Sequence, residues 1–423
     1  MKTSIRSIAL TTLAIVGLAL LPHAQAVVPP PDGGYPGGNT AEGQNALLSL
    51  TTGQNNTAVG LNSLSSTTTS SDNTAIGAGA LRFNTEDDNT ATGARALRNN
   101  TTGGANVANG VDALANNIGG TANTAVGRRA LFSNLGGEEN TAIGNLALAS
   151  NENGGSNTAI GSFALSSNTF GFGNTATGQA ALFSNTTGKV NTAVGMGALD
   201  SNTIGFFNTA VGVGAGHGIT SGKANTAIGS SAGAHQTTGS RNVYIGQGVL
   251  GIPGENDACY IDSIFGQTSA GGVPIVVNSS NKLGTVTSSK RFKENIKPMD
   301  KVSEGLFSLK PITFRYKKEM DEQGIPQFGL VAEDVEKVNP DLVVRDKEGK
   351  PYTVRYDAVN AMLLNEFLKE HGKVEQLLAG AAEQAKEIKE LKATLKEQVS
   401  LIQKVSAQRE MSKHAPKVAK SDQ

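Results

Sequence analysis

The sequence contains a single cysteine, carries no net charge and, beyond its first residues, has no long apolar run. A single cysteine excludes a disulfide within the chain. Because cysteine is among the most buried residue types we expect Cys259 to be buried, and a thiol available for pairing between chains is the alternative. The 36 basic and 36 acidic residues cancel, so no overall field favours nucleic acid as a partner. Without a second apolar run we expect no stable membrane span in the mature protein.

The one apolar run lies at the N-terminus and has the features of a secretory signal. Lys2 and Arg6 precede the apolar residues 8–21, and the small residues of Ala-Gln-Ala follow. This pattern predicts a cleaved signal peptide over residues 1–26, and therefore export to the extracellular space or cell surface, with the periplasm as the alternative. Residues 27–38, rich in proline and glycine, are expected to form a linker.

Residues 39–250 repeat one short pattern thirteen times. Counted from its first asparagine, each copy begins 17 residues after the previous one, apart from a single step of 16. Such a period is typical of a solenoid, in which each coil packs against its neighbours. The copies open on Asn-Thr-Ala-Val/Ile-Gly, which indicates a strand and a glycine corner, and position nine is leucine in eleven of them. We expect two apolar ladders, one of valine or isoleucine at position four and one of leucine at position nine.

Two large apolar side chains per coil make a thin core. Each contributes about 1.5–3 kcal/mol when buried, whereas ordering the backbone costs about 1–2 kcal/mol for every residue. The small alanine and glycine positions provide a second face narrow enough for identical chains to approach one another. We therefore expect a homotrimer, and a monomeric solenoid is the alternative that the periodicity leaves open.

The Asn-Thr-Ala-Val/Ile-Gly copies resemble the head repeats of trimeric autotransporter adhesins, which form β-rolls on bacterial surfaces. The likeness covers about half of the chain. It implies a head for display or adhesion, whose ligand is a host-surface glycan or a protein.

The composition changes after the repeats. Residues 251–287 contain short β-rich pieces between glycine and asparagine turns, and we assign them to a neck. Residues 288–360 have a mixed α/β pattern that predicts a small compact domain. The motifs "SSKRFKENI", "FGLVAEDVEKVNPDLV" and "YTVRYDAVNAMLLNEFLKEH" follow one another from Ser288 onward. In these motifs and their order the chain resembles the intramolecular chaperone domain of endosialidase tailspikes and phage tail fibres.

This second resemblance implies that the domain drives trimerisation of the fibre and then cuts itself off by serine-dependent autoproteolysis. Carried over residue by residue, the nucleophile is Ser288 and the base is Lys293, with Arg291 between them, while the aspartate that follows the nucleophile in the family is Ser289 here. A serine hydroxyl needs a base, and a lysine serves as one where burial and nearby positive charge favour its neutral form. The alternative for this segment is a plain solvated loop.

Residues 361–405 have apolar residues at heptad spacing. One set recurs every seven residues, and a second follows three residues after members of it: Phe367, Val374, Ala381, Ile388, Leu395 and Ile402, then Leu377, Leu391 and Val405. This is the a/d seam of a coiled coil, with Gln384 and Gln398 at two d positions, where a polar residue can fix register and strand number. The alternative is a helix docked on its own domain. Residues 406–423 lack the period and are expected to be a disordered tail.

We therefore predict a mainly β protein: a 17-residue-repeat β-roll or solenoid of 13 coils, a small α/β chaperone domain and a C-terminal coiled-coil helix. Self-cleavage would be its one enzymatic step, with no cofactor and no metal. Two alternatives are a structural surface protein that does not cleave itself and a tailspike-like glycan depolymerase. The latter needs paired carboxylates in a groove, and the few acids of the repeats, such as Glu138 and Glu139, lie in turns.

Overall fold

The computed structural model describes residues 35–413. The expected signal peptide, residues 1–26, the linker as far as residue 34 and the end of the tail from residue 414 lie outside the described residues. The chain divides into two compact units, Met1–Thr268 and Ser269–Gln423, which are described separately below. Within the described part, no helix combines the length and hydropathy needed to cross a membrane.

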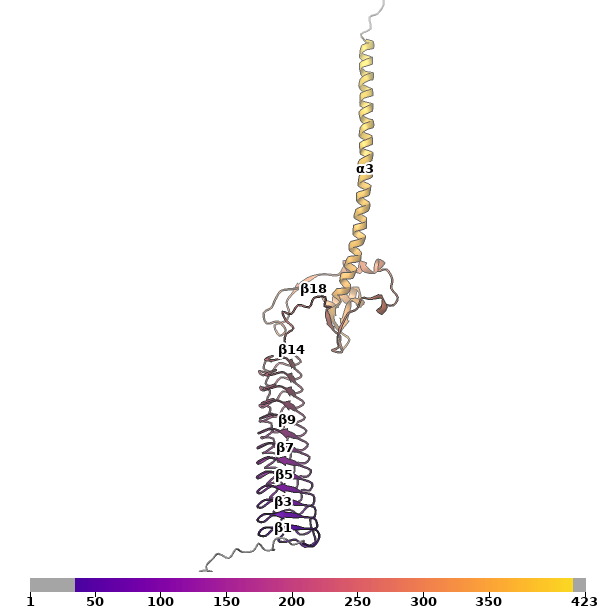
Figure 1. The fold of residues 1–423 in the computed structure, drawn as a ribbon. Helices are drawn as coiled ribbons and strands as arrows, with labels where there is room; N and C mark the ends of the chain where they lie inside the picture. Colours follow the sequence, from indigo (N-terminus) through magenta and orange to yellow (C-terminus); the bar gives the residue numbers. More distant parts are fainter. Residues whose placement is uncertain (1–34, 414–423) are drawn as a thin grey trace, which may run out of the picture. The chain divides into compact units, whose positions relative to one another are not determined.

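The first unit is a β-solenoid, as the fixed period predicts (Figure 1). Every coil contributes one strand of three residues, and the strands pair in parallel with the equivalent strand of the next coil, as Ala142 pairs with Ala159. The thirteen repeats supply β1 to β13, and β14 adds one more strand from the predicted neck. The strands are β1 (Thr40–Glu42), β2 (Thr57–Val59), β3 (Thr74–Ile76), β4 (Thr90–Thr92), β5 (Val107–Asn109), β6 (Thr124–Val126), β7 (Thr141–Ile143), β8 (Thr158–Ile160), β9 (Thr175–Thr177), β10 (Thr192–Val194), β11 (Thr209–Val211), β12 (Thr226–Ile228), β13 (Val243–Ile245) and β14 (Cys259–Ile261).

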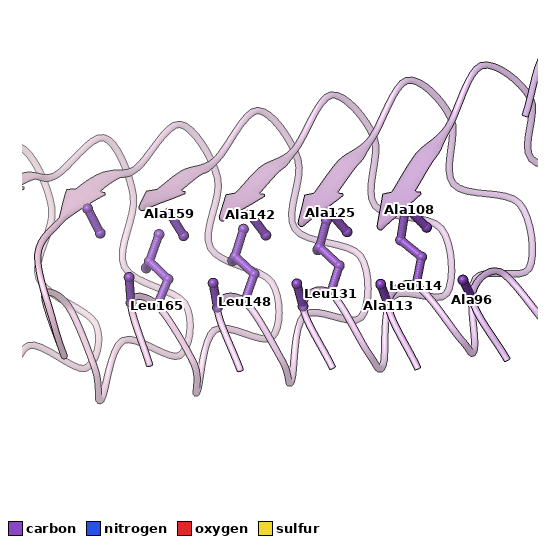
Figure 2. Packing of buried hydrophobic residues seen from close by; sticks show 14 of the residues in the cluster. Ala96, Ala108, Ala113, Leu114, Ala125, Leu131, Ala142, Leu148, Ala159 and Leu165 are labelled. Carbon is purple, nitrogen blue, oxygen red and sulfur yellow. The ribbon is translucent and has the colours of Figure 1, made fainter. Parts of the chain in front are cut away.

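The core of each coil consists of an alanine from the strand and an alanine–leucine pair from the opposite side (Figure 2). In one central coil these are Ala142, Ala147 and Leu148, all fully buried, so the predicted leucine ladder is confirmed. The expected ladder at position four is not part of the core, since Ile143 is 39% exposed. Successive side chains of a strand point to opposite faces, and the inward direction is taken by Ala142.

The glycine at position five lies where neighbouring coils touch. Gly144 has a φ of 138°, and a Cβ on it would lie 2.5 Å from the carbonyl oxygen of Gly161. Only glycine combines a positive φ with so close an approach of two backbones. The expected glycine corner is therefore confirmed, and the contact explains why all thirteen copies have glycine there.

Two buried rows of asparagine, which the sequence analysis did not predict, run along the solenoid beside the apolar core. In the row at position one, the Nδ2 of Asn140 donates to the Oδ1 of Asn123 at 3.1 Å and to the carbonyl of Gly154 at 2.9 Å. In the row at position twelve, the Nδ2 of Asn134 donates to the Oδ1 of Asn117 at 2.7 Å. Because buried amides with satisfied hydrogen bonds hold neighbouring coils in register, these rows supply cohesion that the thin apolar core lacks.

The second asparagine row ends at Asn202, whose buried Oδ1 has no hydrogen-bond partner among the described residues. The next coil has Ile219 at this position, and it has Gly216 in place of the core leucine. A Cβ on Gly216 would lie 2.9 Å from the Leu199 side chain and 3.2 Å from that of Ile219. The isoleucine therefore fills the space that the missing leucine leaves.

Cys259 is exposed, which contradicts the expectation that it is buried. It begins β14 and aligns with Val243 of β13, at a strand position that points away from the core. The inward position next to it is taken by Tyr260, whose ring stacks on that of Tyr244 with centroids 5.8 Å apart. The alternation of the strand, rather than the residue type, decides burial here.

The second unit begins with small antiparallel pairs and short helical segments, in agreement with the mixed domain that the sequence predicts. The pairs are β15 (Ile275–Val277) with β16 (Leu283–Thr285), β17 (Ile312–Phe314) with β18 (Gln327–Gly329), and β19 (Val343–Arg345) with β20 (Pro351–Val354). The helical segments are η1 (Lys290–Phe292), η2 (Asp300–Ser308), α2 (Ala332–Val338) and η3 (Pro340–Leu342). Their small core contains Val335, Leu342, Val343, Val354 and Met362.

The chain continues into α3 (Tyr356–Lys413), a single helix of 58 residues, which confirms the long C-terminal helix (Figure 1). Met362 and Glu366 are its buried residues, so only its first turns pack on the domain. The alternative that the helix docks on its own domain therefore applies to its first turns. It does not explain the apolar heptad positions farther along the helix. The helix also includes residues 406–413, assigned above to a disordered tail, because the stretch Ala-Gln-Arg-Glu-Met within them consists of good helix formers.

Candidate autoproteolytic site

Ser288 and Lys293 lie on the segment between β16 and η2, and their side chains meet. The Nζ of Lys293 donates a hydrogen bond to the Oγ of Ser288 at 3.0 Å. The intervening turn η1 brings them together: the backbone N–H of Phe292 donates to the carbonyl of Ser289 at 3.0 Å, and that of Lys293 donates to the carbonyl of Lys290 at 3.1 Å. A short helical turn therefore places side chains five residues apart within hydrogen-bond distance.

The other two residues of the motif do not join this contact. The guanidinium of Arg291 lies over the ring of Phe292, 4.6 Å from its centroid. Ser289, which stands where the family has an aspartate, precedes η1 and makes no capping hydrogen bond with its side chain. The segment therefore brings together Ser288 and Lys293, while Arg291 and Ser289 lie outside their contact.

The Ser288 hydroxyl and the Lys293 amine have the hydrogen-bond contact that a serine nucleophile and its base require, and they lie on an exposed surface. A hydroxyl and an amine at hydrogen-bond distance are the nucleophile and base of a serine–lysine dyad. Both Ser288 and Lys293 are exposed in the single chain. Because burial favours the neutral form of a lysine, full activation of this pair needs a surface that covers it.

A second serine–lysine contact, which sequence reasoning missed, joins η2 to α3. Ser303 is fully buried, donates to the Oε1 of Glu366 and accepts from the Nζ of Lys369 at 3.3 Å. Lys369 also donates to the Oε1 of Glu366 at 2.7 Å. Hydrogen bonds from Lys369 and then from Ser303 lower the pKa of Glu366 below its usual value, so this carboxylate is charged at neutral pH. These hydrogen bonds tie the start of α3 to η2, and the cluster therefore anchors the helix on the domain.

The acids that a glycan depolymerase would use do not form a catalytic pair in a groove. Glu138 and Glu139 are exposed in a turn, and Glu139 accepts a hydrogen bond from Ser156 at 3.1 Å. A shallow surface groove nearby contains one carboxylate, that of Glu152. Glycoside hydrolysis uses two carboxylates flanking the scissile bond. The arrangement therefore gives no support to the depolymerase alternative.

One comparison with known proteins matches part of the second unit. Residues 288–344 match the protein family described as the chaperone of endosialidase. The match begins at Ser288 and therefore includes both residues of the pair. No curated protein and no solved structure matches the chain. The chain thus carries a chaperone-of-endosialidase domain after a β-solenoid of thirteen repeats, an organisation that fits a tail-fibre-like protein.

Proposed function

We propose that the chain is an exported homotrimeric fibre whose C-terminal domain drives trimer assembly and then releases itself by cleavage at Ser288. The observation that carries the proposal is the 3.0 Å contact between Lys293 Nζ and Ser288 Oγ at the first residue of the matched domain. The solenoid is then the displayed head, outside the cell, where a glycan or protein ligand reaches it.

The outward face of the solenoid strands supports assembly into a trimer. From β2 to β13 its two rows consist of threonine, valine, isoleucine and one asparagine, and they contain no charged residue. Ile143 and Ile160 are each 39% exposed on this face. Burying apolar surface stabilises by about 25 cal/mol per Å², and every coil adds the same increment. A long uncharged face with a mainly apolar row of this kind favours contact with identical faces.

The C-terminal helix supports assembly independently. Its heptad residues beyond the domain, such as Ile388, Leu391 and Leu395, are exposed in the single chain. An a/d seam becomes buried when helices wrap around one another, and Gln384 and Gln398 at d positions favour one register. The helix therefore provides a second interface in the unit that contains the domain.

Assembly would also complete the chemistry of the site. When another chain covers the pair, Lys293 in its neutral form takes the proton of Ser288 Oγ, and the oxygen attacks the neighbouring carbonyl carbon of Thr287. The proton passes to the leaving backbone nitrogen, and an ester replaces the peptide bond. One water then hydrolyses the ester, leaving a carboxylate on Thr287 and the hydroxyl on Ser288.

Intact-mass spectrometry of the folded protein tests this proposal, with wild type compared with Ser288→Ala, Lys293→Met and the control Lys297→Met. Wild type and the control should yield two fragments that meet between residues 287 and 288, and the other two variants should stay whole. If wild type also stays whole, the alternative of a structural protein with a permanent trimerisation domain replaces the self-releasing chaperone.

A further inference from the structure

A surface ridge on the later coils combines aromatic rings with lysines. It consists of residues 170–173, 187–190, 204–207, 221–224 and 238–241, which lie in successive coils on the segment that leads into the next strand, and we call it the corner ridge. None of its residues is an aspartate or a glutamate. The equivalent segments of earlier coils contain no lysine or arginine and include the acids of residues 86–88 and 138–139. The corner ridge is therefore a local feature and not a property of the repeat.

Aromatic and cationic residues alternate along the corner ridge. Phe172, Lys189, Phe206 and Lys223 occupy the same position in four successive coils. The Nζ of Lys189 lies 5.0 Å from the ring centroid of Phe172, and that of Lys223 lies 4.7 Å from the ring centroid of Phe206. Residues of one kind are two coils apart, which corresponds to about 9.5 Å at the usual spacing of strands. The ridge therefore presents one ring and one positive charge in every pair of coils.

These groups are available to a ligand. Phe172 is 47% exposed, and Lys189 and Lys223 are exposed. Neither lysine has a carboxylate partner within the described part of the chain. The ridge ends at Arg241, which forms an ion pair with Asp257 through two hydrogen bonds of 2.5 and 2.7 Å. Two lysines without carboxylate partners, beside the exposed ring of Phe172 and the partly buried ring of Phe206, thus define the surface.

We infer that the corner ridge binds a linear anionic polysaccharide laid along the solenoid. The apolar faces of sugar rings stack on Phe172 and Phe206, and acidic groups of the polymer pair with Lys189 and Lys223. A chain with one carboxylate per disaccharide alternates an apolar sugar face with a charge, as the ridge does. The inference rests on the proposed role of the solenoid as a displayed head, and it names the ligand class of that head.

A nucleic acid fits the ridge less well. A single strand carries a phosphate for every base, and along a helix these charges are only about 3.4 Å apart on each strand. The ridge offers a lysine only about every 9.5 Å. A polymer whose charges are farther apart matches this spacing better. The experiment therefore compares the binding of nucleic acid with that of the polysaccharide.

The experiment measures binding of fluorescently labelled hyaluronan, which has one carboxylate per disaccharide, to the whole folded chain by anisotropy. Unlabelled hyaluronan should compete, neutral chitin oligosaccharides should not, and binding should weaken as salt is added. Phe172→Ala and Phe206→Ala should each weaken binding about tenfold, equivalent to about 1.4 kcal/mol. The double variant Lys189→Glu/Lys223→Glu should abolish it. Phe132→Ala is the matched control, because its ring also pairs with a cation, Arg129, off the ridge.

Several results would overturn the inference: no binding of hyaluronan by wild type, tighter binding of single-stranded DNA, or equal loss in Phe132→Ala. Light scattering on the same samples separates the ridge from the assembly interface. If the Phe172 and Phe206 variants lose binding while the mass of the assembly is unchanged, the ridge is a ligand site. If these variants have a lower mass than wild type, the ridge instead contributes contacts between copies of the chain. A wild-type protein that scatters as one chain contradicts the proposed trimer whatever it binds.

Discussion

Asn140 donates its Nδ2 hydrogen bond to the Oδ1 of Asn123, one coil earlier, at 3.1 Å, and the same contact recurs at position one along the stack. The Oδ1 of Asn140 in turn accepts from the backbone N–H and the Nδ2 of Asn157. Each amide is thus both donor and acceptor to its neighbours. The solenoid therefore has a polar row in addition to its core of alanines and leucines.

Replacing one member of this row should destabilise the solenoid strongly. Asn140→Ala removes the donor to Gly154 and the acceptor for Asn157, and it leaves these buried groups unsatisfied. We expect a loss of about 3 kcal/mol in the free energy of unfolding, measured by urea denaturation. Asn145→Ala, an exposed asparagine of the same coil, is the control and should change little. Equal losses in the two variants would show that the row contributes no particular stability.

The interruption of the second row predicts a coupled pair of substitutions. Gly216→Leu alone overpacks the space filled by Ile219 and should cost about 1–3 kcal/mol. Ile219→Asn alone provides a partner for the Asn202 Oδ1 but leaves a cavity beside Gly216. Together they restore the pattern of the other coils, so the double variant should be more stable than the sum of the two single effects by at least about 1 kcal/mol. A double-mutant cycle by urea unfolding measures this coupling, and strict additivity would rule out the compensation.

Lysines on the strand face should prevent assembly of the head. Ile143→Lys/Ile160→Lys places two ammonium groups in the proposed interface, where burial without a partner is costly. Because α3 provides a second interface, the mass is measured by light scattering on the head released by cleavage before Ser288, and it should fall below that of three heads at low protein concentration. Leu135→Lys is the control, because this leucine is equally exposed but lies off the strand. A trimer that forms normally with both lysines present would place the interface elsewhere.

The anchor of the long helix should depend on pH. Because Lys369 and Ser303 lower the pKa of Glu366 in the folded state, its contribution to stability is fully present above the unfolded value of about 4.3 and is lost as the pH falls through the folded value. Glu366→Gln should therefore lower the Tm of the second unit at about pH 7, and its difference from wild type should shrink toward about pH 3.

Glu370→Gln is the matched control for this helix, because Glu370 pairs with Lys373 at 2.6 Å on an exposed surface. Its effect on Tm should be small at every pH, since exposed ion pairs contribute little. A difference between wild type and Glu366→Gln that stays constant over the whole pH range would contradict the assigned charge of Glu366.

The sequence predicted the coils and the leucine row because period and residue type agree there. The prediction that position four belongs to the core was wrong. It relied on the apolar character of valine and isoleucine, whereas the alternation of side chains along the strand turns Ala142 inward and Ile143 outward. The asparagine rows were missed because asparagine usually indicates a turn, although its presence at position one of all thirteen copies and at position twelve of eight was a visible signal. The burial of these asparagines depends on hydrogen bonds between neighbouring coils. The sequence of one copy does not show these contacts.

In the second unit, too, the sequence predicted one serine–lysine contact and missed the other. Ser288 and Lys293 are near in sequence, and a resemblance in local motifs was enough to name them. Ser303 and Glu366 are 63 residues apart and meet only because α3 packs on η2, so their contact could not be predicted from spacing. Ser288 and Lys293 are both exposed among the described residues. We therefore assign the burial that the proposed activity requires to assembly with other chains.

The most direct test of the account is intact-mass spectrometry of monomer and trimer fractions, separated by gel filtration during refolding. If assembly completes the site, trimers should contain fragments that meet between residues 287 and 288, monomers should contain only the whole chain, and Ser288→Ala should be whole in both. Cleavage that proceeds equally in monomers, or trimers that remain whole in the wild type, would contradict a chaperone that releases itself once the fibre has formed.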